Sequence, residues 1–204
     1  NFLPNDLLGI SYAKAIIKNN YKIDIETIKR TSDYHDTKSN NNIVSASNIR
    51  EKLRNNEDIE KYVPYSILDL IIKPNVENYF KLLKYKINTD NCLDEYLDVD
   101  EGIEYRLQKY INKSNSIDEF IGYIKTKRYT YNKLNRMFIH ILTSLKKEDN
   151  KDLEYIKILG FNNKGKEYLN KLKDLEITTT INKESMQYMY ELRASILYDL
   201  INGT

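Results

Sequence analysis

The segments IDIETIKR at residues 23–30 and VSASNIR at residues 44–50, joined by a polar loop, decide the fold that this sequence predicts. Apolar and polar residues alternate from Ile23 to Ile28, which is typical of a half-buried strand. Lys29 and Arg30 would follow at the strand's carboxyl end, and the second segment opens a helix. Ligands of open α/β sheets bind beyond the carboxyl ends of strands, and helix N-termini attract anions. We therefore expect half of a phosphate-binding nucleotide site here.

The helix opening also has a simpler interpretation as an ordinary cap. Ser45, Ser47 or Asn48 could accept a hydrogen bond from a free backbone N–H group at the helix start. Asn48 and Glu51 also have the spacing of a capping box. The spacing alone does not decide between capping and phosphate binding, so both interpretations stay open at this point.

An ordered set of short motifs resembles one enzyme family along nearly the whole chain. The motifs are Pro4-Asn5-Asp6-Leu7-Leu8-Gly9-Ile10-Ser11-Tyr12, Thr27-Ile28-Lys29-Arg30, Tyr34-His35-Asp36, Val44 to Arg50, Thr126-Lys127-Arg128-Tyr129-Thr130 with Arg136 and His140, and Ile158-Leu159-Gly160-Phe161-Asn162 with Gly165. The Val44–Arg50 segment resembles the Ser-Ser-Thr-x-x-Arg-type segment of HxGH-superfamily adenylyltransferases. The full order resembles the bacterial tRNA(Met) cytidine acetate ligases. Such enzymes open with an HxGH-type motif that is absent here, so we expect a C-terminal portion whose N-terminal half is missing.

The resemblance implies an enzyme that activates acetate with ATP as acetyl-adenylate and acetylates N4 of the wobble cytidine of elongator tRNA(Met). ATP is then a substrate, and a requirement for Mg²⁺ is left open. No metal-ligand motif and no catalytic base are assigned, because His35 beside Asp36 is more typical of a positioning residue. The ATP-binding residues that follow from the resemblance, together with their neighbours in the two segments, are Asn5, Lys29, Arg30, Ser45, Ser47 and Arg50.

Helical periodicity dominates the chain after Pro64. Two strand-like segments flank one of the helices near the C-terminus, which predicts a βαβ-like unit. The expected helices are 65–72, 76–87, 93–99, 102–111, 117–125, 131–145, 164–175 and 184–201, and the expected strands are 155–159 and 177–181. The fold class is therefore α+β and predominantly helical. We expect residues 1–56 to be the C-terminal piece of a Rossmann-like nucleotidyltransferase domain, 57–150 a helical tRNA-binding domain, and 151–204 the βαβ-like unit with a terminal helix.

Charge is unevenly distributed along the helical part. No Lys or Arg occurs between Lys86 and Arg106, where acids gather, whereas seven cations and no acid lie between Glu119 and Glu148. We expect these parts to form separate acidic and basic sides. A basic face with interleaved tyrosines suits RNA phosphates and unpaired bases, although a solvated charged face explains the pattern equally simply. The expected tRNA-binding residues are Lys125, Lys127, Arg128, Lys133 and Arg136.

Composition excludes several other classes. The single cysteine, Cys92, excludes an internal disulfide and cysteine zinc clusters, and no apolar run approaches the roughly 20 residues of a membrane span. The cytoplasm is the default location. Two alternatives remain: a small-molecule adenylyltransferase, for which the helical extension has no obvious purpose, and a non-catalytic tRNA-binding or scaffold module.

Overall fold

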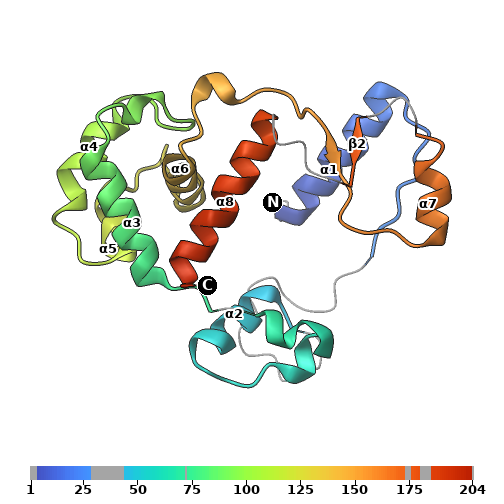
Figure 1. Cartoon of the computed structure of the whole chain (residues 1–204), viewed down its shortest axis with the longest axis horizontal. Coiled ribbons are helices and arrows are strands. Elements are labelled where there is room, and N and C mark those ends of the chain that lie inside the picture. Colours follow the sequence, from blue (N-terminus) through green and yellow to red (C-terminus); the bar gives the residue numbers. More distant parts are fainter. Residues whose placement is uncertain (1–3, 29–43, 72, 173–175, 180–184, 204) are drawn as a thin grey trace. The chain divides into compact units, whose positions relative to one another are not determined.

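A computed structural model of the 204-residue chain describes residues 4–28, 44–71, 73–172, 176–179 and 185–203 (Figure 1). The chain forms two compact units that divide between Ile71 and Ile72. We expected boundaries near residues 56 and 150, and that division into three functional domains stays a prediction.

The described part of the first unit contains two α-helices and two 3-10 helices. These are α1 (Pro4–Asn19), α2 (Ala46–Arg54), and 3-10 helices at Glu60–Tyr62 and Tyr65–Leu70. The expected strand at Ile23–Ile28 is wrong, because residues 21–28 contain no strand. Ile23, Ile25 and Ile28 are 58%, 53% and 96% exposed. An alternating segment becomes a strand only when a neighbour accepts and donates its backbone hydrogen bonds, and none of the described residues does so here.

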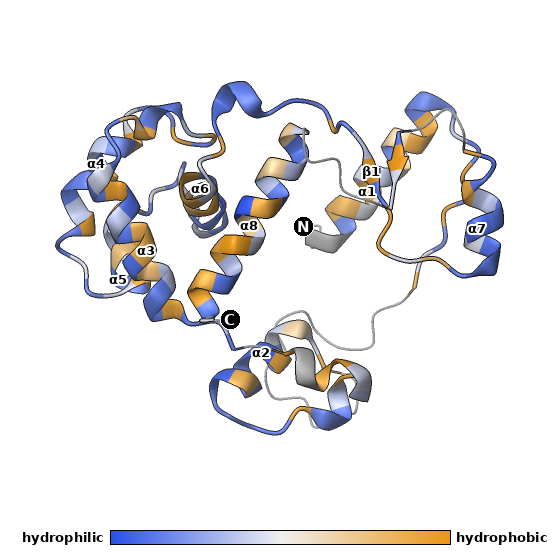
Figure 2. Ribbon diagram, viewed as in Figure 1, coloured by the Kyte–Doolittle hydropathy of each residue, from blue (hydrophilic) through white to orange (hydrophobic). Residues whose placement is uncertain are grey.

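The second unit is built on a bundle in which α3 packs against α4, α5, α6 and α8 (Figure 1). The bundle helices are α3 (Val76–Thr89), α4 (Ile103–Ile111), α5 (Ile117–Ile124), α6 (Tyr131–Thr143) and α8 (Met186–Asn202). Hydrophobic and hydrophilic residues alternate in bands along them (Figure 2), as expected for helices with one buried side. Phe120 lies at the centre, with its ring stacked 5.6 Å from that of Phe138 and tilted against Phe80 at 6.2 Å.

The last helix belongs to this bundle by its packing. The Asn75 backbone N–H donates to Asn202 Oδ1 at 3.3 Å, and Asn78 Nδ2 donates to the Ile201 carbonyl at 3.2 Å. Arg193 Nη1 donates to the Thr143 carbonyl at 3.2 Å. α8 is thus bonded to the start of α3 and to the end of α6.

The expected βαβ-like unit is confirmed in a short form. β1 (Ile156–Lys157) and β2 (Ile177–Thr178) pair in parallel, and α7 (Asn163–Leu169) lies between them in the sequence. Lys157 Nζ contacts Glu191 Oε2 at 2.7 Å, which ties β1 to α8.

Three of the expected helices form differently. The helix expected at 164–175 is α7, which ends at Leu169. The segment 65–72 is a 3-10 helix ending at Leu70 with Tyr65 86% exposed, because Pro64 and Pro74 leave too little chain for several α-helical turns. The segment 93–99 has only a 3-10 turn at Leu93–Glu95. The chain then takes left-handed conformations at Asp98 and Glu101, which end helical propagation.

Candidate functional site

The start of α2 settles the role of Ser45 within this structure. Its Oγ accepts a hydrogen bond from the Asn48 backbone N–H at 3.1 Å, and the residue is buried. Ser45 is therefore the helix cap, with Asn48 three residues inside, so the expected Asn48–Glu51 capping box is wrong. Ser47 lies half-buried in the first turn, and Arg50 is exposed one turn later.

The other expected ATP residues are only partly placed. Asn5 lies in the first turn of α1, at the start of the first unit. Lys29 and Arg30, together with the Tyr34-His35-Asp36 motif, lie outside the described residues. The six-residue ATP set consequently stays a prediction.

The polar face of α6 is organised around one carboxylate. Arg136 donates from Nε to Asp98 Oδ2 at 2.7 Å and from Nη2 to Asp98 Oδ1 at 3.1 Å. His140 Nδ1 lies 3.2 Å from Asp98 Oδ2. Lys133 Nζ sits 4.2 Å from the centroid of the Tyr129 ring. The predicted shared face of Lys133, Arg136 and His140 is therefore present, but an acid already occupies it.

The expected separation of acidic and basic sides is wrong. Four ion pairs join the two windows: Arg128–Glu101 at 2.6 Å, Arg136–Asp98 at 2.7 Å, Lys146–Glu95 at 2.7 Å and Lys147–Asp100 at 2.9 Å. The Tyr129 hydroxyl also donates to the Asp100 carbonyl at 2.6 Å and holds the acidic loop in place. Opposite charges far apart in sequence attract once the chain turns back at Asp98, and sequence spacing alone does not show this.

These contacts change proton affinities. The hydrogen bond from Arg136 lowers the pKa of the Asp98 carboxyl below its usual range, and the same bond raises the pKa of Arg136. The hydrogen bond to Glu95 likewise raises the pKa of Lys146. All of these groups stay charged near neutral pH, so their pairs persist there.

The expected tRNA-binding set therefore splits by its partners. Arg128 and Arg136 are paired with acids, and Lys133 lies over an aromatic ring. Lys125 and Lys127 are exposed and have no ion pair within the described part of the chain.

A second basic cluster, on α4 and the turn that follows it, was not expected from the sequence. Arg106, Lys109 and Lys113 surround Tyr110, which stacks on Tyr123 of α5. The signal was present, because positions 106, 109, 110 and 113 fall on one side of a helix. This signal is weaker than that of the two long windows of one charge sign, because the cluster has only three cations.

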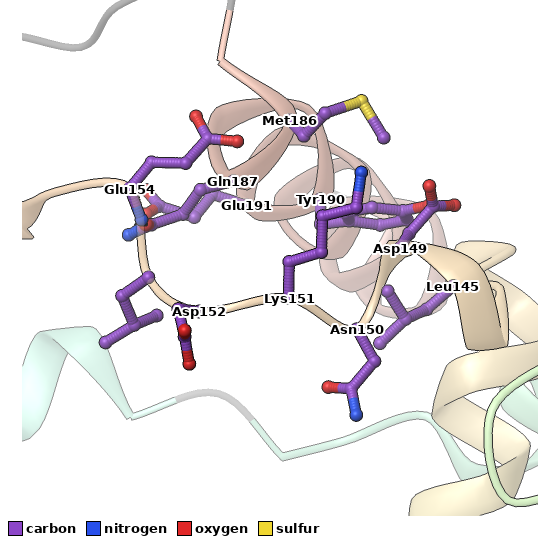
Figure 3. Close-up of a pocket in the computed structure, with 11 residues that line it drawn as sticks. Leu145, Asp149, Asn150, Lys151, Asp152, Glu154, Met186, Gln187, Tyr190 and Glu191 are labelled. Atoms are coloured by element: carbon purple, nitrogen blue, oxygen red, sulfur yellow. Dashed lines mark hydrogen bonds between the residues drawn. The ribbon is translucent and has the colours of Figure 1, made fainter.

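A cavity of about 370 Å³ lies between residues 145–154 and the first half of α8 (Figure 3). Four carboxylates line it, from Asp149, Asp152, Glu154 and Glu191, against one cation from Lys151. Gln187 and Glu191 lie beside Glu154 in this view, and the Tyr190 hydroxyl donates to Asp149 at 2.5 Å. None of the expected ATP or tRNA residues lines it. Its negative balance disfavours phosphate.

Comparison with known proteins places the chain in a family. A sequence model described as HIGH Nucleotidyl Transferase matches residues 2–204. This chain belongs to that family. Two relatives named tRNA(Met) cytidine acetate ligase, from Staphylococcus carnosus and Clostridium perfringens, are each 35% identical to this chain. The Staphylococcus match covers 98% of this chain and 56% of the relative, and the Clostridium match covers 97% and 54%. The chain thus spans about half the length of the curated relatives it matches.

Solved structures show the same fold. The chain matches crystal structures of Thermotoga maritima TmcAL, one bound with alpha-thio ATP and one apo, with TM-scores of 0.72 and 0.75 and 21% identity in both cases. Each match covers 98% of this chain and 55% or 56% of the other. The family resemblance drawn from the short motifs is confirmed, as is the predominantly helical fold. Among the described helices of this family member, none has the length and apolar character needed to cross a membrane.

Proposed function

We propose that this chain works as part of an ATP-dependent tRNA(Met) cytidine acetate ligase. One observation carries the proposal: relatives of that name are about 35% identical over nearly the whole chain. Acetate attacks the α-phosphorus of ATP, and pyrophosphate leaves. The N4 amine of the wobble cytidine in elongator tRNA(Met) then attacks the acetyl carbon, loses a proton, and displaces AMP.

The ATP phosphates would be held by charge and by backbone polarity in the first unit. Arg30 supplies charge-assisted hydrogen bonds, with Lys29 beside it and Asn5 near the nucleotide. The free N–H groups at the start of α2 attract anions. Ser45 already caps that helix, so Ser47 and Arg50 are the members of the segment left to face the ligand. Mg²⁺ would accompany the phosphates, as it commonly does in nucleotide sites.

The tRNA would lie on the second unit. Lys125 and Lys127 are its most available cations in the expected set, because they are exposed and unpaired among the described residues. Lys133 adds a cation above an aromatic ring. Arg128 and Arg136 contribute less, since a phosphate must compete there with Glu101 and Asp98. Such an enzyme would meet its ATP, acetate and tRNA in the cytoplasm.

A non-catalytic tRNA-binding module is the second candidate. The observation that favours it is the separation of roles: the expected ATP residues all lie in residues 1–71, whereas the second unit has its own buried core and its own unpaired cations. A small-molecule adenylyltransferase gains no such support.

The decisive assay supplies the product of the complete gene with tRNA(Met), ATP and acetate and measures N4-acetylcytidine by mass spectrometry. We expect the modified base only when all three are present. Acetylation without ATP would overturn the adenylate route, and ATP binding without any tRNA product would favour a small-molecule adenylyltransferase. tRNA binding without ATP binding would favour the non-catalytic module.

Replacing Arg30 tests the ATP site in the same protein. Arg30→Ala removes hydrogen bonds to a charged group, worth about 1.5 to 3 kcal/mol, so ATP affinity should fall roughly 10- to 150-fold in calorimetry. Lys22→Ala is the matched control, because it removes one exposed cation outside the motif. Equal ATP affinities for Arg30→Ala and wild type would remove Arg30 from the site.

A further inference from the structure

We propose that the α4–α5 face, defined by Arg106, Lys109, Tyr110, Lys113 and Tyr123, binds unpaired nucleotides of the tRNA. The inference rests on the proposed function, since it locates the RNA partner on a surface outside the expected tRNA set.

The aromatic centre of this face is a stacked tyrosine pair. The rings of Tyr110 and Tyr123 lie 5.2 Å apart between centroids and 10° from parallel. Tyr110 is half-buried and packs against the bundle core, whereas Tyr123 stays 43% exposed. Tyr110 stacks on one face of the Tyr123 ring, so a base would stack on the opposite face. An exposed tyrosine face on a rigid support is the kind of platform on which an unpaired base stacks.

Three cations encircle this aromatic centre. Arg106 Cζ, Lys109 Nζ and Lys113 Nζ lie 5.8, 5.5 and 5.7 Å from the centroid of the Tyr110 ring. Arg106 and Lys109 lie on one side of α4 at i and i+3, and Lys113 lies in the turn directly after the helix on the same side of Tyr110. Contact with the ring stabilises the cations without neutralising them.

These charges are available to a ligand, unlike those of α6. None of the three cations has an acid within 4.0 Å in the described parts of the chain, whereas Arg128 and Arg136 both do. The nearby acids on α4 and α5 do not pair with them: Glu104 and Asp118 form no ion pair among the described residues, and Glu119 Oε2 accepts from the Asn115 backbone at 2.8 Å. A phosphate would therefore not need to displace a carboxylate.

Arg106 is also held ready before any ligand arrives. Its Nε and Nη2 donate to the Tyr123 carbonyl at 3.2 and 2.6 Å. A guanidinium has five N–H donors, so three remain for phosphate oxygens. Fixing the side chain in advance lowers the entropy lost on binding. Lys125 follows two residues after Tyr123, so this face adjoins the exposed cations of the expected set.

Unpaired RNA fits this combination better than other acidic partners. An acidic peptide would use the cations but would leave the exposed tyrosine face without a flat partner. A duplex keeps its bases stacked internally and offers none to Tyr123. A tRNA loop supplies both phosphates and unstacked bases.

Filter binding of the chain to a transcribed tRNA(Met) over a range of salt concentrations tests the cations. Lys109→Gln with Lys113→Gln should reduce the slope of log affinity against log salt by about 1.4 to 1.8, or roughly 0.7 to 0.9 per contact. The matched control is Lys14→Gln with Lys18→Gln on α1, which removes two exposed cations elsewhere. The control should keep the wild-type slope, and a slope lowered equally by both pairs would overturn a specific face.

Substitution of Tyr123 tests the stacking. Tyr123→Ala should weaken tRNA binding roughly 5- to 150-fold, the range for loss of one base stacked on an aromatic side chain. Tyr123→Phe keeps the ring and should bind as wild type does. Displacement of the tRNA by polyglutamate as efficiently as by unstructured RNA would overturn the RNA assignment in favour of an acidic protein.

The outcomes separate the two proposals. If wild type binds no tRNA, the proposed function fails and this inference fails with it. If wild type binds with a clear salt slope and the α4 lysine and Tyr123→Ala variants match it, only the α4–α5 face is overturned.

Discussion

α1 and α6 both carry apolar residues at helical spacing, yet only α6 buries those residues within the described chain. Leu134, Met137 and Phe138 of α6 are fully buried, whereas Leu7, Leu8 and Tyr12 of α1 are 53%, 51% and 63% exposed. Apolar residues at helical spacing therefore predict a helix but do not predict which part of the chain it packs against. The second unit thus buries its own hydrophobic core, whereas the first unit exposes the apolar side chains of α1.

The largest expected effect comes from breaking the core of α6. Phe138→Ala removes a ring that stacks on Phe120 at 5.6 Å, so we expect a loss of about 3 to 5 kcal/mol in the free energy of unfolding. Leu8→Ala on α1 should cost less than about 0.5 kcal/mol, because Leu8 already meets solvent. Urea denaturation followed by circular dichroism gives both values. If Leu8→Ala lowers the free energy of unfolding as much as Phe138→Ala does, then α1 packs as tightly as α6 and the contrast between the two helices is wrong.

A smaller effect should follow from the polar side of α6. Arg136→Ala removes the bidentate contact between Arg136 and Asp98. Because the Arg136 side chain is 59% exposed, we expect the free energy of unfolding to fall by only about 1.5 kcal/mol at pH 7. Because Arg136 lowers the pKa of Asp98, this stabilisation is present above the ordinary aspartate pKa of about 3.9 and is lost as pH falls through the lower, folded value.

The pH dependence of that loss is the critical measurement. The difference in unfolding free energy between wild type and Arg136→Ala should shrink when the denaturation is repeated at acidic pH below about 4. Arg50→Ala, an exposed arginine of α2, serves as the control and should show no such change. A difference for Arg136→Ala that is independent of pH would contradict the role assigned to Asp98.

The smallest effect is expected in the first unit. Ser45→Ala removes the cap of α2 and should cost about 1 kcal/mol, measured as faster amide hydrogen exchange within Ala46–Arg54. Ser47→Ala, inside the same helix, should leave the exchange nearly unchanged or slow it. If Ser47→Ala speeds exchange as much as Ser45→Ala does, the assignment of the cap is wrong.

Much of the bundle could be predicted because its helices carry their own signals. The expected ranges 102–111, 117–125 and 131–145 match α4, α5 and α6 to within two residues at each end, since capping residues and apolar spacing are local properties. The segment 23–28 failed for the opposite reason. A strand forms only when a neighbouring strand pairs with its backbone, and the alternation of apolar and polar residues does not reveal whether such a neighbour is present.

The candidate sites could be predicted only in part. Composition located the cations of residues 125–147 but not the acids that neutralise four of them, because those acids come from residues 95–101 through a left-handed turn at Asp98. Conversely, the cluster of α4 is a weaker signal in the sequence, because it has only three cations and follows directly on the acidic residues that end at Glu104. Helical spacing places Arg106, Lys109 and Lys113 on one side with Tyr110, and the folded chain adds that all three cations contact the Tyr110 ring.

The bonds between the start of α3 and the end of α8 delay the completion of this bundle during synthesis. Asn75 and Asn202 are separated by 127 positions, so a ribosome adding about 5 to 20 residues per second needs about 6 to 25 s to supply the second partner. During that interval the sides of α3 and α6 that α8 later covers are exposed to the cell's chaperones and proteases. Ribosome pausing within the codons of α8 (Met186–Asn202) should therefore lower the yield of folded protein more than an equal pause after α6.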